Sequence, residues 1–112
     1  MSSPKWSDLL VSVEREFPSC SKPGATLTAE QVEQLQAVEN AAENFTICVL
    51  HGVAAVGELM VHASAHGELT EELARSSGWL ISALALLSMN IGEEAAAANY
   101  KLQNLPHKGV AK

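Results

Sequence analysis

The sequence is poor in aromatic residues, cysteine and proline. Only 4% of its 112 residues are aromatic, and it has two cysteines and four prolines. Alanine, leucine and glutamate are abundant instead, which is typical of a soluble helical chain of one domain with a modest core. No charged and apolar leader opens the sequence, so Cys20 and Cys48 are expected to be reduced thiols in a cytoplasmic protein.

Positive charge is absent from the middle of the chain. Between Lys22 and Arg75 there is no lysine or arginine, whereas eight glutamates lie there, and the formal net charge is -6. Nucleic acid is therefore not expected as a direct ligand, because its binding is driven by basic side chains that neutralise phosphates. A protein partner with a basic surface fits better. An acidic helix face that only keeps the protein soluble is the competing interpretation.

No pattern of catalytic residues is present. The sequence has no glycine-rich phosphate loop, no nucleophile spaced with a base, and no Glu-x-x-His motif of the di-iron bundles. Cys48, His51, His62 and His66 resemble zinc ligands in their spacing, but Cys48 and His62 are about 21 Å apart on an unbroken helix. We therefore expect no enzyme activity, no cofactor and no metal. His62 and His66, one turn apart, are the remaining candidate pair for a metal.

The longest periodic stretch runs from Thr28 to His66 and predicts a helix over about residues 29–66. Thr28 and Gln31 can form a capping box at its start, and Gly67 is suited to ending it. Apolar residues recur along it at steps of three and four, which is a helical stripe: Leu35, Val38, Ala42, Phe45, Val49, Val53, Val56, Met60 and Ala63.

The length of this helix has a consequence for packing. It would measure about 57 Å, whereas a compact chain of this size has a radius of gyration of about 13 Å. Either the helix breaks at Gly52 or Gly57, or its exposed seam is shared with another copy of the chain. The stripe stays in phase across both glycines, which favours the second alternative.

A second long helix is predicted over about residues 71–103. Thr70 can cap it, acidic residues follow in its first turn, and Pro106 stops it. The turn after Gly67 is short, so the two long helices are expected to be antiparallel neighbours. The main seam of the second helix is expected to be Leu73, Leu80, Leu84, Leu87, Ile91, Ala98 and Leu102.

The segment before the hairpin reads as a short amphipathic helix. It opens at Ser3 and Pro4, ends at Pro18, and carries Trp6, Leu9, Leu10, Val13 and Phe17 on one side. A linker rich in Ser, Pro and Gly follows, so this helix is expected to pack back on the hairpin or to reach a neighbouring subunit. The chain thus divides into residues 1–22 (the first helix and the start of the linker), 23–104 (the hairpin) and 105–112 (a flexible tail).

The stretch from Trp79 to Ile91 is apolar nearly all the way round the second helix. One antiparallel neighbour cannot cover it, so we predict an all-α protein whose helical hairpin forms a homodimer, a four-helix bundle. The expected interface is Trp79, Leu80, Ala83, Leu84, Leu86, Leu87 and Ile91. This stretch is short for a membrane span, and the longer one at 45–61 contains His51 and Glu58. A membrane hairpin is therefore an alternative and not the expectation.

One polar face of the first long helix is the candidate site for a partner. It lies opposite the apolar seam and consists of Glu33, Asn40, Asn44, His51, Glu58 and His62. Its carboxylates can pair with Arg or Lys in a basic groove, and protonation of its histidines would oppose that pairing. Ordinary exposure to solvent is the alternative explanation.

These features together predict a binding protein without chemistry of its own. It would regulate or inhibit a partner protein by occupying a basic surface, as small acidic helical proteins carried by phages and plasmids do, an analogy that rests on size and charge alone. Two alternatives stay open. One is a helical bundle that binds a metal or small ligand at His62 and His66, and the other is a structural subunit of a larger assembly.

Overall fold

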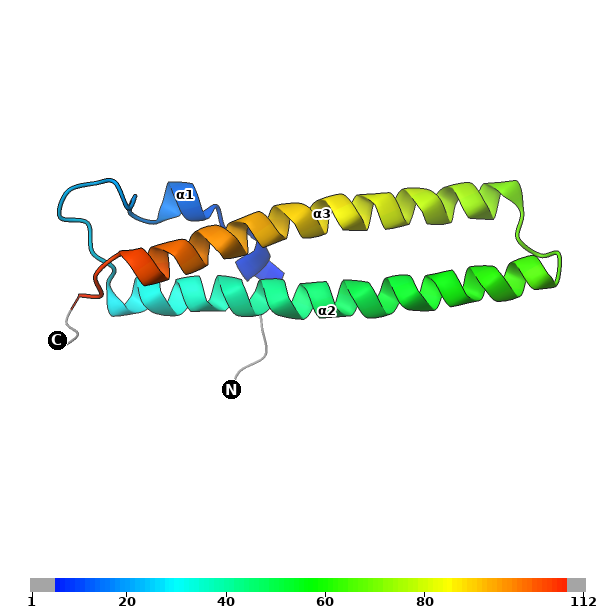
Figure 1. The fold of residues 1–112 in the computed structure, drawn as a ribbon, viewed down its shortest axis with the longest axis horizontal. Coiled ribbons are helices and arrows are strands. Elements are labelled where there is room, and N and C mark those ends of the chain that lie inside the picture. The colour runs from blue at the N-terminus through cyan, green and yellow to red at the C-terminus, as the bar shows by residue number, and fades with distance from the viewer. Residues whose placement is uncertain (1–5, 109–112) are drawn as a thin grey trace. The chain divides into compact units, whose positions relative to one another are not determined.

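The protein is all-α, with two long helices packed antiparallel (Figure 1). This computed structural model describes residues 6–108. A 3-10 helix, η1, spans Trp6–Leu10, and the short helix α1 spans Val13–Glu16. The long helices are α2, Ala29–Ala65, and α3, Glu71–Asn104. The antiparallel hairpin predicted from the sequence is confirmed.

Local signals fix the starts of the two long helices. The backbone N–H of Gln31 donates to Thr28 Oγ1 at 3.1 Å, and the N–H of Thr28 donates to Gln31 Oε1 at 2.9 Å. This reciprocal pair is the predicted capping box. At the start of α3, the N–H of Leu73 donates to Thr70 Oγ1 at 3.1 Å, so Thr70 caps that helix as expected.

The end of α2 depends on a glycine with positive φ. Gly67 has a φ of 68°, its N–H donates to the carbonyl of Ser64 at 3.1 Å, and the N–H of Glu68 donates to that of Ala63 at 2.8 Å. These are the two bonds of a Schellman motif. Before it, α2 continues without interruption through Gly52 and Gly57, so of the two alternatives for this helix, a break at these glycines is wrong.

Two glycine substitutions are expected to change stability in opposite directions. Gly67→Ala places a Cβ on left-handed backbone and should lower the free energy of unfolding by about 1 kcal/mol or somewhat more. Gly78 lies inside α3, and a Cβ built there meets nothing within 4 Å, so Gly78→Ala should raise that free energy by about 1 kcal/mol. Urea unfolding followed by circular dichroism measures both changes. Shifts of equal sign would contradict this account of the two positions.

The segment before α2 differs from the single amphipathic helix that was predicted. It is split into η1 and α1, because Ser12 adopts extended backbone and its N–H donates to Glu16 Oε2 at 2.8 Å, which restarts the helix. Val13 is 0% exposed and Phe17 8%, but Leu10 is 86% exposed. Leu10 therefore does not share the buried side with the other two.

Two parts of the prediction for this segment have different outcomes. Ser3, Pro4 and the side chain of Trp6 lie outside what the structure describes. The expectation that the segment packs back on the hairpin is confirmed, because Val13 and Phe17 belong to one buried cluster with residues of α2 and α3.

The chain after α3 is held by backbone hydrogen bonds as far as Lys108. The N–H of Leu27 donates to the carbonyl of Pro106 at 2.8 Å, and the N–H of Lys108 donates to that of Leu27 at 2.6 Å. An isolated parallel β-bridge joins Leu27 to His107, and Leu105 is buried. Residues 105–108 are therefore not the flexible tail that the sequence predicted, and residues 109–112 lie outside the described part of the chain.

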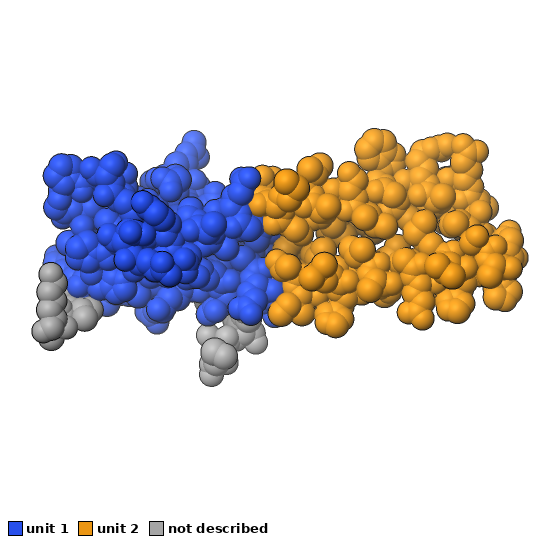
Figure 2. All heavy atoms as spheres, viewed as in Figure 1, with its two compact units in different colours: residues 1–44, 91–112 blue, residues 45–90 orange. Residues whose placement is uncertain are grey.

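The structure divides into two compact units (Figure 2). Unit 1 comprises residues 1–44 and 91–112, and unit 2 comprises residues 45–90. All the buried apolar side chains among the described residues belong to unit 1: Val13, Phe17, Leu27, Leu35, Val38, Ala41, Ala42, Ile91, Ala98 and Leu105. Unit 2 is described throughout, and it contains no buried residue. A core of the usual kind is thus present in one unit only.

The contact between α2 and α3 in unit 2 confirms one predicted seam and corrects the other. The α2 residues of the predicted stripe, from Phe45 to Ala63, are half-buried. On α3 the half-buried row is Ala74, Ser77, Ile81, Leu84 and Ser88. Leu73, Leu80 and Leu87, expected in the main seam, are 52%, 50% and 47% exposed. Two helices touch along a stripe narrower than the apolar surface of α3, and the row in contact is the one with smaller residues.

Candidate interaction surface

The polar face of α2 is exposed in both units. Glu33, Asn40 and Asn44 are exposed in unit 1, and His51, Glu58 and His62 are exposed in unit 2. The α2 seam residues Val49 and Val56 are half-buried on the other side of the helix, which is why these polar groups face water. The exposure predicted for each candidate residue of this face is confirmed.

Two local contacts involve this face at the end of α2. His62 Nε2 lies 4.0 Å from Glu58 Oε1, with both side chains more than two-thirds exposed, so an ion pair there contributes little even when His62 is protonated. His66 Nδ1 lies 2.8 Å from the carbonyl oxygen of His62. That nitrogen is therefore the donor of a hydrogen bond to backbone and does not face the His62 ring.

The histidines and cysteines do not assemble a metal site in the described part of the chain. No group of three or more His, Cys, Asp or Glu side chains there is arranged to hold a metal ion. In the candidate pair, His62 Nε2 lies near Glu58, and His66 Nδ1 donates to the carbonyl of His62. In the structure these imidazoles are separate polar groups on a helix.

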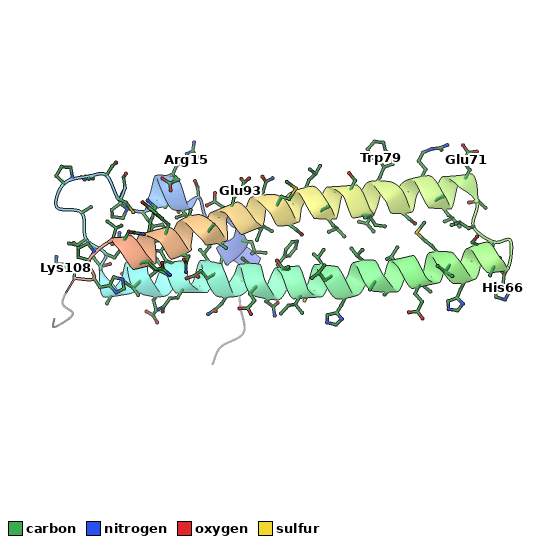
Figure 3. All side chains as sticks on the ribbon, in the orientation of Figure 1. Arg15, His66, Glu71, Trp79, Glu93 and Lys108 are labelled. Atoms are coloured by element: carbon green, nitrogen blue, oxygen red, sulfur yellow. The ribbon has the colours of Figure 1, made fainter. Side chains whose placement is uncertain are left out.

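Apolar side chains cover much of unit 2 and face outward. Twelve large apolar or aromatic side chains are exposed among the described residues, and ten of them lie in this unit: Ile47, Leu50, Leu59, Val61, Leu73, Trp79, Leu80, Leu86, Leu87 and Met89. Trp79, 71% exposed, points away from α2 (Figure 3). A hairpin of two helices has no third element to cover these side chains, so they remain in contact with water.

The residues predicted for a dimer interface do not all lie on this exposed surface. Trp79, Leu80, Ala83, Leu86 and Leu87 are exposed. Leu84 is half-buried, and Ile91 is 5% exposed within unit 1. These two residues lie one heptad apart in the row of α3 that turns toward the inside of the hairpin, which explains why they differ from the other five.

Both long helices also have the length and composition of membrane spans. Windows of 18 residues in α2 and α3 have mean hydropathies of 1.6 and 1.3, and only 0% and 6% of these windows is buried. A buried core helix of a soluble protein gives the same hydropathy, but it is largely covered by its own chain. Here the apolar surface needs another explanation.

Two charged residues that hold the N-terminal segment were missed by the sequence analysis. The Nζ of Lys101, a side chain only 2% exposed, donates to the carbonyl of Pro18 at 2.7 Å and lies 3.7 Å from Glu14 Oε2. Glu94 Oε2 accepts a hydrogen bond from the N–H of Val13 at 2.8 Å. The sequence does contain one indication of this role. Glu94 and Lys101 continue, at steps of seven, the row of leucines at positions 73, 80 and 87 of α3.

The described side chains provide charged, polar and apolar groups for contacts with another molecule. Carboxylates, amides and imidazoles lie along α2, and ten large apolar side chains are exposed in unit 2. Such surfaces can pair with charged groups and exclude water against another molecule. No known protein family, curated protein or solved structure matches this chain.

Proposed function

We propose that this chain is a cytoplasmic, helical, protein-binding regulator of the inhibitor type. It acts by occupying a basic surface of a partner protein and has no catalytic activity of its own. The observation that carries the proposal is the exposed polar face of α2, which lies in a stretch without any lysine or arginine between Lys22 and Arg75. A helix holds such groups at fixed spacing, so it can match a basic groove at little cost in conformational entropy.

The acidic members of this face supply the attraction. Glu33 and Glu58 are exposed, and each can pair with Arg or Lys of a partner. Complementary charge speeds association and selects partners more than it adds affinity. The proposed contact is therefore expected to weaken as salt concentration rises.

The binding protein is proposed to be a homodimer, with two hairpins forming a four-helix bundle. The ten exposed apolar side chains of unit 2 support this assembly, because a soluble monomer rarely exposes so large an apolar surface. The α3 segment from Trp79 to Leu87 lies near the centre of the proposed bundle. In this assembly Glu33 and Glu58 of α2 remain in water and accessible to the partner.

Insertion of the hairpin into a membrane is the second candidate, favoured by the hydropathy of the two long helices. Against it, His51, Glu58 and His62 are all exposed in unit 2. Lipid surrounding the hairpin would have to accept these polar groups, and a charged residue at the centre of a spanning helix costs about 2.5–3.5 kcal/mol or more. The soluble dimer avoids this cost.

Capture of the partner by the immobilised protein tests the proposal. Bound proteins from a cell lysate are identified by mass spectrometry and compared with those bound by Glu33→Lys/Glu58→Lys. Loss of two charge-assisted contacts should weaken capture about tenfold or more. The matched control is Glu72→Lys/Glu93→Lys, which changes the net charge equally at exposed positions of α3 and should leave capture unchanged. Equal capture by both double variants would contradict the role of the α2 face.

A further inference from the structure

The N-terminal segment forms a third layer on the hairpin in unit 1. Val13 and Phe17 pack in one cluster with Leu35 and Val38 of α2 and with Ala98 of α3. In Figure 1, α1 lies beside the C-terminal part of α3. Polar contacts from Glu94 and Lys101 of α3 secure the segment. In this unit the chain thus covers its own helices.

The faces of α2 and α3 that hold this segment extend into unit 2 at heptad steps. On α3, Lys101 and Glu94 are followed toward the start of the helix by Leu87, Leu80 and Leu73. On α2, Val38 is followed by Phe45, Gly52 and Leu59. Positions seven apart lie on nearly the same side of a helix. We call these the seat residues of unit 2: Phe45, Gly52 and Leu59 on α2, and Leu73, Leu80 and Leu87 on α3.

All the seat residues except Phe45, which is half-buried, are exposed. The three leucines of α3 are 47–52% exposed and Leu59 is 67% exposed. A Cβ built on Gly52 meets nothing within 4 Å. None of the seat residues is charged, whereas the two positions that continue the α3 row in unit 1 are a glutamate and a lysine, both engaged by the N-terminal segment. The row therefore changes from apolar to charged where the chain begins to cover itself.

We infer that the seat residues of unit 2 receive a helix from a second copy of this chain, in the role that the N-terminal segment has in unit 1. The inference deepens the dimer of the proposed function and rests on it. It selects the leucine row of α3 over the neighbouring row of Trp79 and Leu86. The interface on α3 is expected to end at Leu87, because the next two residues of the row, Glu94 and Lys101, already contact the N-terminal segment of their own chain.

The exposed area of the chain agrees with this occupant. The solvent-accessible surface of the whole chain, residues 1–5 and 109–112 included, is 8058 Å², whereas a compact monomer of 11.9 kDa is expected to have about 5,900 Å². The excess of roughly 2,100 Å² falls in the range of about 1,000–2,500 Å² that each partner buries in an obligate homodimer. A second copy is therefore sufficient to cover the excess.

A second copy also suits the polar side of unit 2 better than lipid does. His51, Glu58 and His62 are exposed on α2. A protein helix seated on one side of the hairpin leaves these groups in water, whereas a bilayer would surround the hairpin on all sides.

Two double variants at exposed positions test the inference. Leu80→Glu/Leu87→Glu places charges in the seat, and Trp79→Glu/Leu86→Glu places them in the neighbouring row. Light scattering after size-exclusion chromatography gives the mass at micromolar concentrations. We expect a dimer for the unmodified chain, a monomer for the seat variant, and a dimer for the neighbouring-row variant. Circular dichroism checks that the variants are helical, and Leu80→Ser/Leu87→Ser replaces the seat variant if the glutamates unfold it.

The outcomes separate this inference from the function it rests on. A dimer that survives the seat variant, or that is lost in the neighbouring-row variant, overturns the assignment to the leucine row and leaves the proposed dimer standing. A monomeric unmodified chain overturns both. Flotation with phosphatidylcholine vesicles adds a further readout, because recovery of the unmodified chain with the vesicles would show lipid, and not a second copy, as the occupant.

Discussion

Replacing Phe17 by alanine is expected to lower the free energy of unfolding by about 3–5 kcal/mol. The side chain is 8% exposed and belongs to the buried cluster of unit 1, with Leu27 and Leu35 among its members. Truncation removes the whole ring and leaves a cavity, because the helices on either side are fixed by their own hydrogen bonds. Urea unfolding monitored by circular dichroism measures the loss.

The matched control is Leu10→Ala in the same N-terminal segment. Leu10 is 86% exposed, so its truncation should change the free energy of unfolding by no more than about 0.5 kcal/mol. A single amphipathic helix, as the sequence pattern predicted, would bury Leu10 and Phe17 on one side and make both substitutions costly. A large loss for Leu10→Ala would therefore support that continuous helix over the break at Ser12.

The helix ends were predictable because their chemistry is local. The capping box of Thr28 and Gln31 needs only two side chains three positions apart. The stop at Gly67 needs only a residue that tolerates positive φ. Neither depends on what the helix packs against, and both are present in the structure as the sequence indicated.

The orientation of α3 about its axis was not predictable in the same way. Leu80 and Leu87 are as apolar as Ile81 and Leu84, so hydrophobic periodicity does not distinguish the row that faces α2 from the row beside it. The choice depends on the fit between two helices, including the small residues Ala74 and Ser77. The α2 seam was predicted correctly because polar residues occupy the face opposite to it.

The candidate site was predictable in part for the same reason. The exposure of Glu33 and Glu58 follows from their place opposite a well-defined seam. The contacts of Glu94 and Lys101 did not follow, because both residues lie on α3 and their partners are backbone groups more than 80 positions away. A charged residue in line with leucines indicates a special environment, but its partner depends on the tertiary fold.

The lysine at position 101 is the second residue whose replacement is expected to have a large effect. Lys101→Met keeps a side chain of similar length and removes the donor to the carbonyl of Pro18, at 2.7 Å. A hydrogen bond from a charged group contributes about 1.5–3 kcal/mol, and a buried carbonyl without a donor carries a similar penalty. We therefore expect the free energy of unfolding to fall by about 1.5–3 kcal/mol in urea titrations. Lys22→Met, at an exposed position, is the control and should have little effect.

Lys101→Met would raise the free energy of unfolding if the desolvation penalty of the buried ammonium exceeded the contribution of its contacts. Removing a buried charge also removes its desolvation penalty, and well-packed apolar residues sometimes replace buried ion pairs with a gain in stability. Here Glu14 Oε2 lies 3.7 Å from Lys101 Nζ, but the Glu14 side chain is 74% exposed. Its carboxylate therefore offsets little of the desolvation penalty of the buried ammonium. The Pro18 carbonyl is the main partner of Lys101. If Lys101→Met unfolds at higher urea than the unmodified chain, the lysine does not stabilise the N-terminal segment. Its contact would then serve to fix where that segment lies on α3.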